Sequence, residues 1–135
     1  MWLKVLLALT IVLLAGNGVH MLFAPEHWYH SIDSVAHTGP FNPHFVRDIG
    51  CAYLAAALGL ALGMWRREWT VPGAATALVF LGQHGGVHLW EAIAGHGGAA
   101  HETWIDWLGI YGPPAVALLA LGWAVLNRHQ WEATS

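Results

Sequence analysis

The sequence is poor in charged side chains. Asp, Glu, Lys and Arg make up 10% of its 135 residues, against about 25% in a typical soluble domain. So few charges could not cover the surface of a soluble domain of this length, whereas a lipid bilayer accepts an apolar exterior. The scarcity of charge therefore predicts an integral membrane protein.

Cysteine and clustered basic residues are also scarce. The single Cys51 excludes an intrachain disulfide, a CxxC redox motif and a c-type haem site. The formal net charge is −3 and the five Lys and Arg residues form no basic stripe. We therefore expect no nucleic-acid partner.

What the sequence has instead is long uncharged runs, at residues 5–25, 49–65, 71–90 and 107–127. Crossing the hydrocarbon takes about 20 apolar residues as a helix. The runs predict an all-α integral membrane four-helix bundle in lipid, as one domain with spans at about 3–24, 43–65, 71–94 and 105–127. The first run follows a basic start as a signal peptide would, but it is long and no A-x-A site follows, so we interpret it as a retained helix.

The basic residues predict the orientation. Lys4, Arg66, Arg67 and Arg128 flank the first helix, the 66–70 turn and the end of the last helix. Four crossings place all three regions on one side, which the positive-inside rule makes cytoplasmic. We therefore expect an N-in, C-in topology with two histidine-rich outer loops, at about 25–42 and 95–105.

Local signals predict some helix boundaries and contacts. Asn42-Pro43 is typical of an N-cap followed by proline at the first helical position, and Thr70 suggests the same device for the third span. Gly112-Pro113-Pro114 should kink the fourth span or split off its first turn. The small residues Gly59 and Gly63 favour close helix contact within one bundle over a dimer face.

Nine of the ten histidines belong to the outer half, His129 being the exception. The sharpest group is on the third span, where His84, His88 and Glu91 fall within about 60° on one helical face. Two histidines spaced i, i+4 can offer both imidazoles to one metal ion. This pattern makes the third span the centre of the candidate site.

Residues from two other spans are predicted to lie at a similar depth in the membrane and so to join the candidate site. His84 lies roughly 20 Å above the inner end of its helix at 1.5 Å per residue, and His20 and Asp48 fall close to the level of His88. Ionisable residues inside a membrane normally face the bundle interior and are paired or functional. The predicted metal ligands are therefore His20, His84, His88, Asp48 and Glu91.

The donor set suggests the cofactor. Imidazole with carboxylate suits Cu, Fe or Zn, and haem b is the alternative, with His20 and either His84 or His88 as axial ligands. Simpler interpretations stay open. Arg47 and Asp48 could be only an ion pair or an anchor at the helix start, and five outer histidines could be solvated loop residues: His27, His30, His37, His96 and His101.

The four-span plan and the start of the second span, Arg47-Asp48-Ile49-Gly50-Cys51-Ala52-Tyr53-Leu54, resemble small bacterial membrane proteins of the DoxX-like type. The resemblance implies a location in the bacterial inner membrane. That group includes proteins associated with quinone-linked sulfur oxidation, so the resemblance favours a redox role. It supplies no functional residue.

Two classes of function remain, and the sequence leaves open whether the protein is an enzyme. The first is a metal- or haem-dependent membrane oxidoreductase at the outer interface, reached laterally by a quinone or another apolar small molecule. In it His20, His84 and His88 bind the cofactor, while the catalytic group comprises Asp48, Glu91 and Arg47. The second is a non-catalytic metal or proton carrier, a sensor, or an accessory subunit, as a homo-oligomer or in a larger membrane complex.

Overall fold

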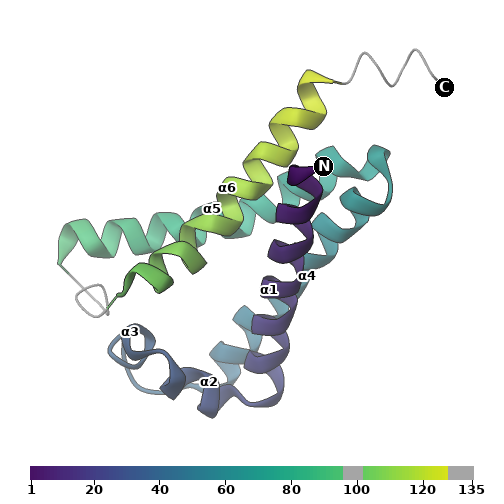
Figure 1. Ribbon diagram of the computed structural model, residues 1–135. Helices are drawn as coiled ribbons and strands as arrows, with labels where there is room; N and C mark the ends of the chain where they lie inside the picture. Colours follow the sequence, from purple (N-terminus) through teal and green to yellow (C-terminus); the bar gives the residue numbers. More distant parts are fainter. Residues whose placement is uncertain (96–101, 128–135) are drawn as a thin grey trace.

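The computed structural model describes residues 1–95 and 102–127, and every regular element among them is a helix (Figure 1). This confirms the all-α prediction for that part of the chain. Each of the four long helices begins and ends within one residue of a predicted span. In chain order the elements are α1 (Trp2–Phe23), α2 (Pro25–Ser31), α3 (Asp33–Ala36), α4 (Pro43–Trp65), the 3₁₀ turn η1 (Arg67–Trp69), α5 (Thr70–Ala94) and α6 (Trp104–Leu126).

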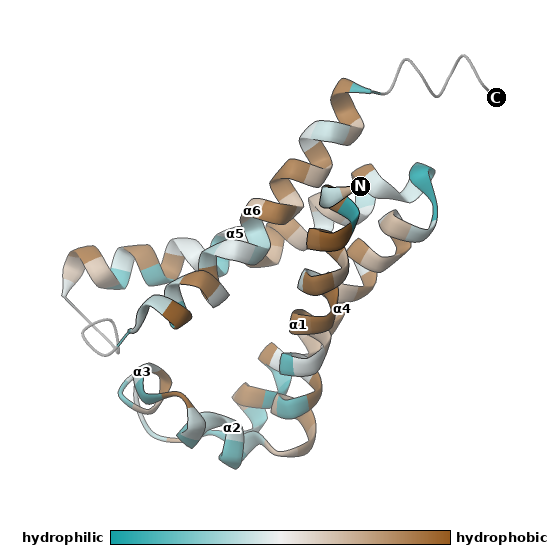
Figure 2. Cartoon of the chain, in the orientation of Figure 1, coloured by the Kyte–Doolittle hydropathy of each residue, from teal (hydrophilic) through white to brown (hydrophobic). Residues whose placement is uncertain are grey.

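Within the described residues, three helices are long and apolar enough to cross a membrane: α1, α4 and α6. The fourth long helix, α5, has 25 residues but carries polar side chains in its outer half, among them Gln83, His84 and His88. Figure 2 shows this difference, since apolar colour dominates α1 and α6 while polar patches interrupt α5. The chain is therefore a membrane protein with several apolar helices in contact with lipid.

The distribution of apolar side chains fits a lipid environment. Large apolar residues such as Leu9, Val12 and Leu118 are exposed on the outside of the helices. Lipid tails are as apolar as leucine, so helices in a bilayer associate chiefly where small residues let their backbones approach. The buried positions are accordingly rich in alanine: Ala56, Ala57, Ala74, Ala77, Ala117, Ala120 and Ala124.

The four long helices contact one another in the order α1, α4, α5, α6, and α6 also contacts α1. Glycines make the closest approaches. A Cβ on Gly18 would lie 2.8 Å from the Gly50 carbonyl oxygen, and a Cβ on Gly73 would overlap the Gly59 carbonyl oxygen. The prediction that Gly59 and Gly63 pack within one chain is confirmed, because a Cβ on Gly63 would meet the backbone of Thr70.

The positions of these contacts determine the shape. We call the end of the molecule that holds Lys4 and Arg67 the inner end and the opposite end the outer end, after the predicted orientation. Gly59 lies toward the inner end of α4 and Gly73 lies in the first turn of α5, so these helices cross near their inner ends. Beyond the crossing, the α5–α6 pair and the α1–α4 pair diverge toward their outer ends (Figure 1). The short helix α2 contacts α1 and α4. The outer half of the molecule is therefore open where the inner half is closed.

The segment 25–42 was predicted to be a loop, and that prediction is wrong because α2 and α3 form there. Side chains tie the segment down. The Trp28 indole donates to Asn17 Oδ1 of α1 at 2.7 Å, and the Tyr29 hydroxyl donates to the carbonyls of Ala36 and Gly39. These bonds join residues 7 to 11 positions apart, and the hydrophobic pattern of the segment did not reveal them.

The first of the three predicted helix-boundary signals, at Asn42, is confirmed. The Asn42 side chain accepts from the backbone of His44 and Phe45 and caps α4. Thr70 is not an N-cap: it is the first residue of α5, and its hydroxyl donates to the Gly63 carbonyl at 2.9 Å. No turn is split from α6, because Pro113 and Pro114 lie within one continuous helix.

Replacing Gly73 by Ala should destabilise the protein, because the new methyl group must push α4 away from α5. Overpacking of a close contact costs about 1–3 kcal/mol, more than the helix propensity that alanine adds. The matched control is Gly82→Ala on the same helix, where a Cβ meets nothing within 4 Å. Thermal unfolding in detergent, followed by circular dichroism, should show a lower Tm for Gly73→Ala only. Equal Tm values for the two variants would contradict the crossing described above.

Candidate functional site

The candidate site centres on the two histidines of the outer half of α5. The imidazole rings of His84 and His88 lie edge to face with centroids 4.7 Å apart. His84 Nε2 shares a hydrogen bond of 3.0 Å with the Tyr53 hydroxyl of α4, and its ring stacks on Phe80. His84 therefore turns toward α4.

The partner of His88 is a residue that the sequence did not single out, Glu102. His88 Nδ1 donates to Glu102 Oε1 at 2.7 Å, and the Glu102 side chain is only 2% exposed. A capping box fixes the adjacent helix start: the Thr103 hydroxyl accepts from the Asp106 backbone, and the Asp106 carboxylate accepts from the Thr103 backbone. The box anchors the beginning of α6 and thereby places Glu102 against α5.

Two buried polar atoms at this site have no hydrogen-bond partner among the described residues: Glu102 Oε2 and the Tyr111 hydroxyl. Buried polar atoms are normally hydrogen-bonded, because leaving one unsatisfied costs about 1–3 kcal/mol. Tyr111 comes from α6, and its ring lies beside Gly85 of α5, where a Cβ would be in ordinary van der Waals contact with it at 3.4 Å. An acceptor and a hydroxyl are therefore both available to a molecule or a proton that enters the site.

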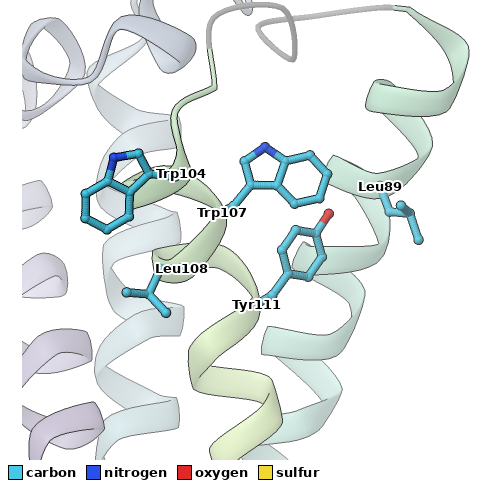
Figure 3. Close-up of a pocket in the computed structure, with 5 residues that line it drawn as sticks. All are labelled: Leu89, Trp104, Trp107, Leu108 and Tyr111. Atoms are coloured by element: carbon cyan, nitrogen blue, oxygen red, sulfur yellow. The ribbon is translucent and has the colours of Figure 1, made fainter.

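An apolar hollow adjoins the site and is lined by Leu89, Trp104, Trp107, Leu108 and Tyr111. In Figure 3, Trp107 and Tyr111 point from α6 toward α5 and Leu89, whereas Trp104 lies on the other side of the helix. The Trp107 and Tyr111 rings have centroids 5.1 Å apart. Tyr111 thus belongs both to the wall of the hollow and to the polar site.

The structure places the predicted residues of α4 elsewhere. Asp48 lies 3.4 Å from His44 one turn away, and 61% of its side chain is exposed. Arg47 donates from Nε to the Leu22 carbonyl of α1 at 3.2 Å. The structure therefore gives these two residues separate contacts and no contact with each other. It favours an anchoring role for Arg47 over a role beside His84.

His20 also has a different neighbour from the one predicted. Its Nε2 shares a hydrogen bond of 2.8 Å with Nδ1 of His27, from α2. The haem b interpretation needs His20 to face His84 or His88, but the outer end of α1 diverges from the outer half of α5 (Figure 1).

The five predicted metal ligands do not come together as one set. In the described ranges 1–95 and 102–127, no group of three or more His, Cys, Asp or Glu side chains is placed to hold a metal ion. Glu91 is half-buried one turn beyond His88. The loop histidines His96 and His101 lie outside the described residues. The structure thus brings together His84 and His88 alone among the predicted ligands.

The sequence analysis missed Glu102, Tyr53 and Tyr111. One local signal was available for Glu102, because Thr103 and Asp106 have capping-box spacing and place the acidic residue directly before a helix. Tyr53 and Tyr111 carried no such signal. Their roles depend on which faces of α4 and α6 meet α5, and this is a property of the tertiary structure.

Comparison with known proteins agrees with the resemblance noted from the second span. The chain matches no curated protein and no solved structure. A sequence model of the DoxX-like family matches residues 5–125. That range includes all of α2 to α5 and most of α1 and α6, together with every residue of the candidate site. The chain belongs to the DoxX-like family.

Proposed function

We propose that the chain crosses the inner membrane of a bacterium four times, as a four-helix bundle with α5 as the fourth span and both termini in the cytoplasm. With 25 residues, α5 is about 37 Å long, more than the roughly 30 Å of hydrocarbon. It contacts α4 and α6, which are both apolar enough to span. Its histidines turn toward other helices, as ionisable residues in a membrane normally do. Lys4 and Arg67 line one hollow, so these two cations lie at the same end of the molecule.

Reporter fusions after Ser135 and in the turn at 66–70 should both give cytoplasmic signals, and a fusion within 32–40 should give an extracytoplasmic one. The physical reason is the retention of positively charged flanks on the cytoplasmic side. A reporter active inside the cell only and one active outside only should give complementary results at each site. An extracytoplasmic signal at Ser135 or in the turn would reject the orientation.

For the site itself, we propose a redox-linked function in which the protein handles protons for an apolar redox molecule at the outer interface. The observation that carries this proposal is the buried Glu102 carboxylate, with one oxygen bonded to His88 and the other without a partner in the described chain. An ionisable group that is buried so deeply is costly unless it has a function. Carboxylate, imidazole and phenol are all groups that can pass protons.

The contacts supply a route for those protons. Tyr53 and His84 form one hydrogen-bonded pair, and His88 and Glu102 form another. The two imidazole rings meet between the pairs. Because imidazole can accept a proton on one nitrogen and release it from the other, the four side chains form a polar path from α4 to the start of α6.

The hollow beside Tyr111 supplies a place for the apolar molecule. Its lining is aromatic and aliphatic and it opens to the lipid side, so a quinone could enter laterally. A quinone carbonyl needs a donor, and the Tyr111 hydroxyl has no partner among the described side chains. Reduction of a quinone to the quinol takes two electrons and two protons. The described residues offer the protons, and the electrons must come from a redox partner in a membrane complex.

Replacing Tyr111 by Phe should weaken binding of a short-chain ubiquinone analogue about fivefold, because one hydrogen bond of about 1 kcal/mol is lost. Calorimetric titration of the purified protein in detergent measures the Kd. The matched control is Tyr29→Phe, which removes a hydroxyl that bonds within the segment 25–42, away from the hollow. An unchanged Kd for Tyr111→Phe, or no binding by the wild type, would reject the quinone site.

A second candidate function is metal handling without catalysis, by a carrier, a sensor or an accessory subunit. The contact of His84 with His88 favours it, because an i, i+4 histidine pair offers two imidazoles to one ion. Further ligands would have to come from Glu91 one turn away or from another chain in a homo-oligomer or larger complex. The described residues do not complete a metal site, so we assign no step of the function to a metal.

Under this second candidate, His88→Ala should release bound metal, because removing a ligand abolishes a direct bond. His37→Ala should not, since His37 is exposed and contacts Asp33 in α3. Elemental analysis and an absorption spectrum of gently purified protein give the metal and haem content of both variants. Full occupancy in both variants would reject His88 as a ligand, and wild-type protein free of metal and haem would reject metal binding altogether. Either result leaves the redox-linked proposal to the quinone titration.

A further inference from the structure

A second hollow lies at the opposite end of the molecule, where the inner ends of all four long helices converge. Its floor is formed by the buried side chains of Leu7, Thr70 and Ala120. These residues belong to α1, α5 and α6, and Gly63 and Met64 of α4 complete the wall. In Figure 1 the N-terminus lies beside the α4–α5 connection and the end of α6, which is where this hollow is found. The function proposed for the outer site makes no use of it.

The rim of the inner hollow is cationic and aromatic. Lys4 and Arg67 line it, and no Asp or Glu is among its described lining residues. The carboxylate of the nearby Glu68 lies 3.6 Å from Arg66, and the Arg67 guanidinium lies over the Trp123 ring, 5.9 Å from its centroid. Three tryptophans complete the wall: Trp2, Trp65 and Trp123.

This combination matches one class of ligand. Tryptophan rings prefer the headgroup level of a bilayer, so the hollow lies where a phospholipid places its phosphate. Basic pockets between membrane helices on the cytoplasmic side suit acidic headgroups. Below the rim, Leu3, Leu7 and Ala120 offer an apolar surface to an acyl chain. A free anion would be attracted by the cations, but it would leave this apolar floor uncovered.

We infer that the inner hollow binds one acidic phospholipid of the cytoplasmic leaflet, with its phosphate between Lys4 and Arg67 and an acyl chain along α1 and α6. The group that the two cations would bind is a phosphate anion, which either a lipid headgroup or inorganic phosphate could supply. The assignment to the cytoplasmic leaflet rests on the proposed orientation, whereas the preference for an acidic lipid does not.

The test is lipid retention by the full chain. Protein reconstituted in nanodiscs with equal phosphatidylglycerol and phosphatidylcholine is extracted into detergent, and the lipids that stay bound are counted by native mass spectrometry. Lys4→Gln and Arg67→Gln should each lower phosphatidylglycerol retention about fivefold, as expected for loss of one cation near an acidic headgroup. Arg66→Gln is the charge-matched control, because Arg66 pairs with Glu68 and does not line the hollow.

The proposal would be supported by two results. The wild type and Arg66→Gln should each retain one phosphatidylglycerol selectively, and Arg67→Lys should retain more of it than Arg67→Gln. Because the substituted side chains are exposed, circular dichroism should show unchanged folding. Equal retention of both lipids by the wild type, or equal losses in Arg66→Gln and Arg67→Gln, would overturn the proposal. Displacement of the lipid by millimolar inorganic phosphate would also overturn it, because the hollow would then be a site for free anions.

Discussion

The backbone contact between Gly59 and Gly73 is the constraint on which the rest of the structure depends. Neither position leaves space for a side chain, so α4 and α5 touch near their inner ends and separate outward. In a bilayer such contacts between small residues are the main source of helix association, since lipid competes equally for larger apolar side chains. The single crossing therefore determines which outer faces meet. It brings Tyr53 to His84 and leaves Asp48 on the exposed side of α4.

The outer polar residues follow from a second constraint, the absence of water in the membrane interior. Polar groups there must bond to one another or carry a large desolvation cost. Tyr53 with His84, and His88 with Glu102, obey this rule as pairs. Glu102 Oε2 and the Tyr111 hydroxyl do not obey it within the described residues. The outer site thus combines two hydrogen-bonded pairs with two buried atoms that have no partner among the described residues.

The sequence predicted those features that depend on local chemistry or on the bilayer. Helix positions follow from the uncharged runs, the Asn42 cap from its side chain, and the role of Gly59 and Gly63 from their size. The predicted metal ligands were grouped by their depth in the membrane, counted along each helix. Side chains at the same depth can still lie far apart in the plane of the membrane. His20 and Asp48 were placed at the level of His88, yet the structure gives them other partners, His27 and His44. Glu102 was not predicted, because its burial depends on the contact of α5 with α6.

The same crossing accounts for both hollows. Helices that converge at the inner end bring residues of all four around one space, so the inner hollow is lined by α1, α4, α5 and α6 together. Helices that diverge at the outer end leave the hollow there to α5 and α6 alone, and it stays open to lipid. The two hollows share no lining residue. The helices α5 and α6 contribute to both hollows, so a ligand at one end is connected to the other end through these two helices.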